Sequence, residues 1–270
     1  MKSIKPVELF LSLGLAVTLG ACGAGGEGGE GQETTTQVEQ ITTTTQDEGG
    51  EGGEGGEGGE GVTTEDAEVD YATTLSLMLG HLMVAEELMA MGEYEQAEPH
   101  IGHPVEELYG DIEGQLGDRG VEDFKATLNS AHDLIKTSPD APETQTQLEE
   151  SIKAIDQAIA AVGEEKLNDP AFNLDIINNL LQVAGQEYAA AIADNKFVEA
   201  IEYQDSRGFV MHGSMMFEQI SGQLDSEKSI EIGKAFAELK TAWPSIIPPE
   251  TPIKSPQEVL GLIVNIEANS

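Results

Sequence analysis

The sequence is short of cysteine and of basic residues, and each shortage excludes something. Cys22 is the only cysteine among 270 residues, so the chain forms no internal disulfide and its folded part has no cysteine nucleophile. Lysine and arginine total 13 against 50 aspartates and glutamates, a formal net charge of −37. A chain this acidic repels nucleic acid and anionic lipid, so we expect neither as a partner, and it attracts cations.

Several catalytic motifs are also absent. The sequence has no phosphate-binding Gly-rich loop, no His-Glu-x-x-His zinc motif and no Gly-x-Ser-x-Gly nucleophile turn. Nothing in the chain therefore requires an enzyme, and we predict a protein that binds without catalysing a reaction.

The N-terminus has the pattern of a secretory leader over residues 1–21. Lys2 and Lys5 precede an apolar run over residues 9–19, which is too short for a membrane span. It ends in Leu19-Gly20-Ala21-Cys22, which resembles the lipobox of bacterial lipoproteins. That resemblance implies cleavage before Cys22 and lipidation of its thiol. The alternative is an ordinary signal peptide followed by an incidental cysteine.

The residue after the cysteine bears on location. In that lipoprotein class, Gly23 in place of an aspartate implies sorting to the outer membrane, facing the periplasm or the cell surface. Acyl chains on one residue give a stable anchor. The resemblance therefore predicts a protein of the cell envelope that contacts the membrane through Cys22.

Residues 22–67 form a low-complexity segment. Gly-Gly-Glu repeats fill residues 49–61, and a Thr/Gln-rich stretch covers residues 34–46. The segment has too few apolar residues to offset chain entropy by burial, so we predict a disordered linker. A folded domain over residues 68–270 would follow it.

The remaining residues predict an all-α domain. Apolar positions recur every three or four residues, and alternating β-branched runs are missing. The expected helices cover residues 69–91, 93–98, 104–116, 121–135, 143–162, 170–193, 196–224, 226–243 and 255–268, with a Pro-rich strap over residues 244–256. Gly208 and Gly213 are candidate break points within the helix over residues 196–224. Short connections favour an antiparallel helical bundle, for which two four-helix bundles sharing a face is one arrangement.

The most informative stretch is a corner rich in histidine and proline before residue 104. Pro104 fits the first turn of a helix, with His100 and His103 just before it and Glu106 and Glu107 in its first turn. Two imidazoles and nearby carboxylates form a ligand set for a first-row metal. His81, on the first helix, could join them. The alternative is that these histidines are polar caps, with His81 half-buried on a helix flank.

The pair His103-x-x-Glu106 resembles the His-x-x-Glu motif of the imelysin-like family of periplasmic and lipoprotein helical proteins. Gly102 directly precedes the histidine, whereas the family form has a glycine two residues before it. The resemblance implies a role in binding iron or another metal outside the cytoplasm, with His103 and Glu106 as ligands. Because such proteins have been grouped with peptidases, a hydrolase is a further alternative, although the sequence offers no nucleophile.

A secondary group of candidate ligands lies on the seventh predicted helix. Glu199 and Glu202 are three residues apart and can share a face, with Asp205 one turn further and His212 beyond. Tyr188 and Tyr203 could donate to such ligands. Because glutamates are common in this chain, a solvated helix face is the alternative reading. His132 is interpreted as a surface residue.

Together these patterns predict a membrane-anchored extracytoplasmic lipoprotein that captures a metal ion, with iron ahead of zinc and copper. A membrane transporter or surface protein of the envelope is its expected partner. The alternative is an interaction module of the envelope that binds a protein or a small organic ligand in a groove. Converging histidines would favour metal capture, and scattered histidines would favour the module.

Overall fold

The computed structural model describes residues 63–270; the predicted leader, Cys22 and the linker as far as residue 62 lie outside the described residues. The described part is helical almost throughout, which confirms the all-α prediction. Its helices are α1 (Ala67–Met91), α2 (Tyr94–His103), α3 (Tyr109–Leu116), α4 (Lys125–Thr137), α5 (Pro142–Ala160), α6 (Glu164–Leu167), α7 (Pro170–Ala190), α8 (Ala200–Ile220), α9 (Ser226–Leu239) and α10 (Pro256–Ala268). One hairpin, β1 (Ile192–Ala193) with β2 (Lys196–Phe197), is antiparallel.

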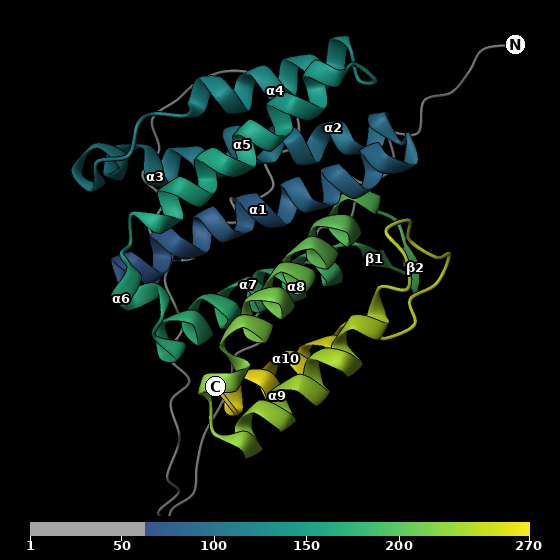
Figure 1. The fold of residues 1–270 in the computed structure, drawn as a ribbon. Helices are drawn as coiled ribbons and strands as arrows, with labels where there is room; N and C mark the ends of the chain where they lie inside the picture. The colour runs from purple at the N-terminus through teal and green to yellow at the C-terminus, as the bar shows by residue number, and fades with distance from the viewer. Residues whose placement is uncertain (1–62) are drawn as a thin grey trace, which may run out of the picture. The chain divides into compact units, whose positions relative to one another are not determined.

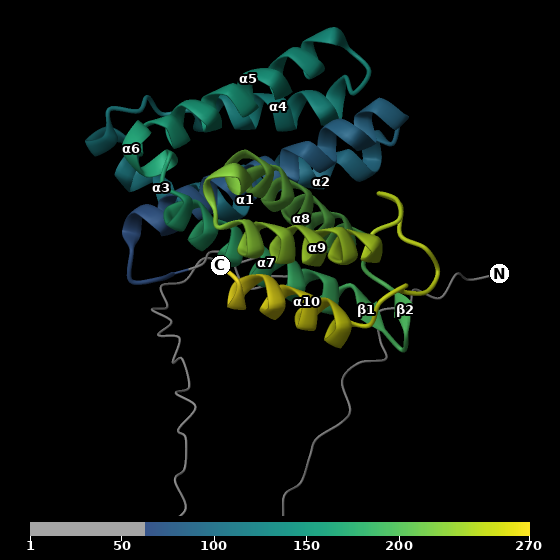
Figure 2. The same cartoon turned by 60° about the horizontal axis from the view of Figure 1, so that its bottom comes forward.

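The helices stack as successive pairs. In Figure 1, α4 and α5 form one outer layer, followed by α1 with α2, then α7 with α8, and finally α9 with α10. Figure 2 again shows α4 and α5 on the outer side of α1 and α2. Helix α1 packs against α2 and α5 on one side and against α7 and α8 on the other. It is therefore the element through which an N-terminal group of helices meets the C-terminal bundle of α7 to α10.

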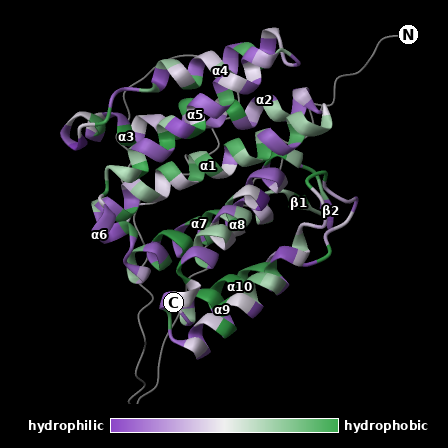
Figure 3. Ribbon diagram, viewed as in Figure 1, coloured by the Kyte–Doolittle hydropathy of each residue, from purple (hydrophilic) through white to green (hydrophobic). Residues whose placement is uncertain are grey.

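The central position of α1 explains its composition. Leu75, Leu77, Met78 and Leu79 are all buried although they point in different directions around the helix, as expected for a core helix. Among the described residues, α1 is long and apolar enough to cross a membrane by length and composition, but 67% of its apolar window is buried in the fold. Figure 3 shows the contrast with α6, which is hydrophilic.

Several helix ends follow the signals in the sequence. Gly92 ends α1 in the left-handed region at φ 80°, where glycine pays no steric cost. Asp169 caps α7 by accepting from the backbone N–H of Ala171, with Pro170 in the first turn. Ser255 and Glu258 form a capping box at the start of α10. The predicted end at residue 91 and start at residue 170 are confirmed.

Two local predictions are wrong. The helix expected to start at residue 196 begins at Ala200, because Asp194 and Asn195 take positive φ values of 49° and 60° and turn the chain into the hairpin. The expected break at Gly208 or Gly213 does not occur, since α8 is continuous through both.

The Pro-rich strap is held by tyrosines. The hydroxyl of Tyr188 donates to the carbonyl oxygen of Lys254 at 2.7 Å. The hydroxyl of Tyr203 donates to the carbonyl oxygen of Ser245 at 2.6 Å. The two tyrosines thus fix residues 244–256 to α7 and α8. The sequence had suggested that these tyrosines donate hydrogen bonds to metal ligands, but their hydroxyls donate to the strap instead.

Candidate metal centre

A close crossing of α1 and α8 sets the position of the site. A Cβ atom on Gly208 would lie 2.5 Å from the carbonyl oxygen of Gly80, and one on Gly80 would lie 2.6 Å from the ring of Phe209. Only glycines allow backbones to approach this closely. His81 follows the first glycine and Asp205 lies one turn before the second, so the crossing brings the imidazole and the carboxylate together.

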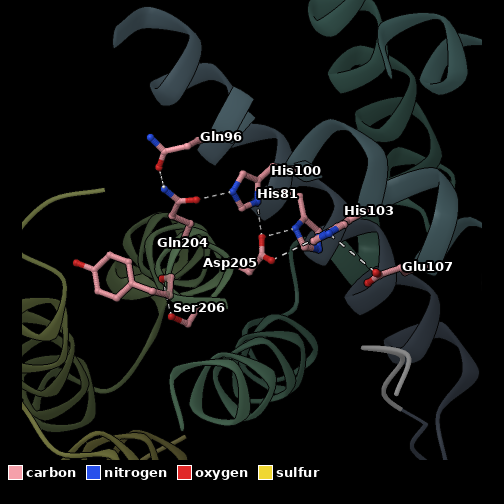
Figure 4. Close-up of polar contacts among 9 residues, drawn as sticks. His81, Gln96, His100, His103, Glu107, Gln204, Asp205 and Ser206 are labelled. Atoms are coloured by element: carbon pink, nitrogen blue, oxygen red, sulfur yellow. Dashed lines mark hydrogen bonds and ion pairs between the residues drawn. The ribbon is translucent and has the colours of Figure 1, made fainter. Parts of the chain in front are cut away.

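Three histidines and one aspartate converge at this crossing (Figure 4). The Nδ1 atoms of His81 and His100 each lie 2.7 Å from Oδ1 of Asp205. The Nδ1 atom of His103 lies 3.4 Å from Oδ2 of the same carboxylate. One ligand atom from each of the four residues falls within 4.8 Å of all the others. His81 comes from α1, His100 and His103 from α2, and Asp205 from α8.

The unsatisfied atoms of this cluster face each other. His103 Nδ1 and Asp205 Oδ2 are buried and have no hydrogen-bond partner. Buried polar atoms normally have a hydrogen-bond partner, so the lack of one at both atoms indicates that another group could bind between them. Two ligands held ~2.1 Å from one ion are about 3.0–3.4 Å apart in octahedral or tetrahedral geometry. The observed 3.4 Å fits that spacing, and small ring movements would bring the two 2.7 Å contacts to it.

The charges in the cluster favour an ionised carboxylate. Burial by itself raises the pKa of Asp205, but the charges of His81 and His100, the hydrogen bond from His100 and the nearby ring of His103 lower this pKa well below its ordinary value. For His103, burial lowers the pKa, but the carboxylates of Asp205 and Glu107 together raise it more, so the net pKa is above its ordinary value of 6.5. The carboxylate is thus a permanent negative charge among nitrogen donors, as a cation site requires.

The course of α2 differs from the predicted corner at Pro104. The chain does not turn there: α2 continues into a π-helical segment, Pro104–Leu108, before α3. Proline has no N–H to donate to the preceding turn, which favours such a wide turn, and π segments are frequent at functional sites. Helix and π segment together present His100 and His103 from the middle of a continuous helical run.

The wide turn separates the two glutamates. Glu107 Oε1 lies 3.9 Å from His103 Nε2, on the side of the ring away from Asp205. Glu106 does not approach His103; its Oε1 lies 3.5 Å from Nδ1 of His132, and 59% of its side chain is exposed. The structure therefore places Glu106 outside the cluster and Glu107 at its edge.

His132 is not the surface residue that the sequence suggested. Only 8% of its side chain is exposed, and its Nε2 lies 2.6 Å from Oε1 of Glu98. It packs on Gly102, where an added Cβ would come within 2.8 Å of the ring. The glycine inside the histidine stretch thus makes room for a neighbouring helix, α4.

The secondary group is divided by the structure. Asp205 joins the three histidines, whereas Glu199 is an exposed residue that precedes α8 and Glu202 is outside the cluster. His212 follows Asp205 by seven residues, which is about 10 Å along a helix. Burial lowers the pKa of His212 to about 4, so this ring is neutral at pH 7.

Sequence reasoning missed the glutamines. Gln204 is fully buried and its Oε1 lies 2.9 Å from His100 Nε2, while its Nε2 donates to Gln96 Oε1 at 3.0 Å. Gln96 lies one helical turn before His100, so spacing alone could have paired them. The contact between Gln204 and His100 depends on the packing of α8 against α2 and has no signal in the sequence.

Comparison with known proteins adds one finding. Residues 163–270, which contain α6 to α10, match a family described as the iron permease-associated 4-helix bundle domain. The match supports an iron-associated helical domain over these residues. Asp205 lies within the matched region, and the three histidines lie before it. No curated protein and no solved structure matches the chain.

Proposed function

We propose that this chain binds a metal ion at His81, His100, His103 and Asp205, and that its function is the capture of iron. The observation that carries the proposal is the facing pair of buried, unpartnered atoms, His103 Nδ1 and Asp205 Oδ2. A cation between them satisfies both. The histidines converge, which is the arrangement expected of metal capture and not of the alternative interaction module.

The ligand types favour a divalent transition metal. Imidazole nitrogens suit iron, copper, zinc and nickel, and sets of histidine with one carboxylate are typical of Fe(II). The single carboxylate supplies one negative charge in a buried site, which leaves less uncompensated charge with a divalent ion than with a trivalent one. The match to an iron permease-associated domain then favours iron, with zinc and copper as alternative occupants.

We further propose that the protein captures its ion without catalysing a reaction. The sequence has none of the nucleophile or hydrolase motifs considered above, and Asp205 is enclosed by three imidazoles that would all act as ligands. His103, with 16% of its side chain exposed, is the ligand on the solvent side, so an ion would enter past it and Glu107.

The resemblance of the leader to a lipobox supports a lipid anchor at Cys22 outside the cytoplasm, with residues 23–67 as a spacer. The matched domain is named for its association with iron permeases, which supports a membrane iron transporter as the partner that receives the ion. The net charge of −37 would attract cations toward the protein.

Metal analysis of the purified full-length chain tests the proposal. After exposure to Fe(II) without oxygen, and separately to Zn(II) and Cu(II), followed by desalting, we expect about one ion per chain. Asp205→Asn and His103→Ala should lose the ion, and His212→Gln, a matched change of a histidine away from the cluster, should keep it. A wild-type chain that retains none of the three metals would overturn the proposal.

A further inference from the structure

A row of two side-chain amides connects the candidate site to the protein surface. Starting at the surface, Gln96 Nε2 donates to Oε2 of Glu93 at 3.0 Å. Gln204 Nε2 donates to Oε1 of Gln96 at 3.0 Å, and Gln204 Oε1 lies 2.9 Å from His100 Nε2. Figure 4 shows Gln96, Gln204 and His100 in line, with the other nitrogen of His100 turned to Asp205.

The direction of each hydrogen bond in this row is fixed by its outer end. A carboxylate only accepts hydrogen bonds, so Gln96 must turn its NH₂ group to Glu93 and its oxygen to Gln204. Gln204 must then donate to that oxygen, which leaves its own carbonyl oxygen facing His100. A carbonyl oxygen only accepts, so the Nε2 atom of His100 must carry a hydrogen.

We propose that Gln204 and Gln96 are positioning residues that fix His100 in the form with hydrogen on Nε2, so that Nδ1 is its metal-binding atom. This inference rests on the proposed function, because it names which nitrogen of a proposed ligand faces the ion. Nδ1 is 2.7 Å from Asp205 Oδ1, so a positive centre must lie between these two atoms: a proton on Nδ1 when the site holds no metal, or the metal ion when it does. Because Nε2 is committed to Gln204, Nδ1 is the nitrogen that faces the ion.

The arrangement has the chemistry of supporting groups at metal centres. A histidine ligand usually donates its second ring N–H to an oxygen, which sets the ring orientation and strengthens the ligand, and loss of such a partner reduces metal affinity about 10- to 100-fold. Gln204 is adjacent to Asp205 in α8, and Gln96 lies one turn before His100 in α2. The row therefore also fixes α8 and α2 relative to each other at the site.

The test measures the hydrogen position and the affinity separately. Long-range 1H–15N correlation spectra of the full-length chain report which nitrogen of each of the five histidines carries hydrogen, both without metal and with Zn(II), with the His100 signals assigned from His100→Gln. Gln204→Leu removes the side-chain oxygen that accepts from His100 at nearly constant size, whereas Gln204→Glu keeps an oxygen there. Gln219→Leu is the matched control, because it makes the same change at an exposed position of α8.

We expect hydrogen on Nε2 of His100 in the wild type, with and without Zn(II). Gln204→Leu should lose the fixed Nε2–H signal and bind Zn(II) about 10- to 100-fold more weakly. Gln204→Glu should keep the signal and most of the affinity, and Gln219→Leu should match the wild type. Because Gln204 is buried, circular dichroism of each variant controls for folding.

Two results would overturn the inference: a wild-type His100 with a bare Nε2, or a Gln204→Leu variant with unchanged hydrogen position and unchanged affinity. Failure of the proposed function looks different, since the wild type would then bind no Zn(II) or iron. In that case the metal-free spectra still decide whether the glutamines fix the ring.

Discussion

Gly80 and Gly208 touch backbone to backbone where α1 crosses α8, so closely that a Cβ on Gly208 would lie 2.5 Å from the Gly80 carbonyl oxygen. His81 and Asp205 reach each other because of this approach. The geometry of the candidate site is thus a consequence of two residues that have no side chain, and it can be tested by adding one methyl group.

Gly208→Ala should push α8 away from α1. The added methyl meets the Gly80 backbone at 2.5 Å and Val84 Cγ2 at 2.7 Å, and backbone cannot move aside as a side chain end can. Overpacking of this kind costs about 1–3 kcal/mol of unfolding free energy, and metal affinity should fall with it.

Gly213→Ala is the control on the same helix. The atoms nearest to its added methyl group are 3.9 Å away, so its free energy of unfolding should rise by ~0.5–1 kcal/mol through helix propensity. Urea unfolding compares the two, and a Gly208→Ala chain as stable as Gly213→Ala would contradict the crossing.

The two glutamates after His103 should differ in their effect. Glu107→Gln removes a charge 3.9 Å from His103 Nε2 and should weaken metal binding about two- to fivefold, as expected of an ion pair worth less than ~1 kcal/mol. Glu106→Gln should leave affinity unchanged, because Glu106 faces His132. Zn(II) titration of both variants distinguishes them. A larger loss in Glu106→Gln would show that the His-x-x-Glu spacing, and not the observed geometry, identifies the ligand.

Metal affinity should fall in acid. Burial lowers the pKa of His103, but the carboxylates of Asp205 and Glu107 together raise it more, so the net pKa lies above 6.5. A proton and a metal ion compete for the same nitrogen, so affinity is complete above this pKa and decreases as the pH falls through it. Asp205 stays ionised over that range because its pKa is lowered. Titrations with Zn(II) from about pH 8.5 to about 5.5 should show the decrease beginning above pH 6.5. A metal affinity that stays unchanged down to pH 5.5 would count against His103 as a ligand.

Metal binding should stabilise the fold as a whole. The four ligands come from α1 and α2 of one layer and from α8 of the next, so unfolding of any of these helices releases the ion. At a free metal concentration of 100 times the dissociation constant, the gain is about 2.7 kcal/mol. Thermal unfolding with and without Zn(II) measures it. Asp205→Asn should show no metal-dependent shift, and a shift equal to that of the wild type would place the ion elsewhere.

The sequence predicted the helices well where local signals act. Gly92, Pro170 and the Ser255–Glu258 pair mark helix ends through backbone geometry and capping bonds that involve only neighbouring residues. Prediction was wrong where distant packing decides, as at Gly208, which reads as a helix breaker but is the contact point of two helices. His132 was misassigned for the same reason, since its burial depends on Gly102 of another helix.

By itself, the sequence determined an acidic, almost entirely helical domain and a small set of histidines as the candidates for metal binding, and it predicted a leader of lipoprotein type. These follow from composition, periodicity and short-range spacing. Only the tertiary structure decided that Asp205 joins His81, His100 and His103, that Glu106 does not, and that Gln204 faces His100. These residues are separated by up to 124 positions, and the packing of α1 and α2 against α8 is what brings them together.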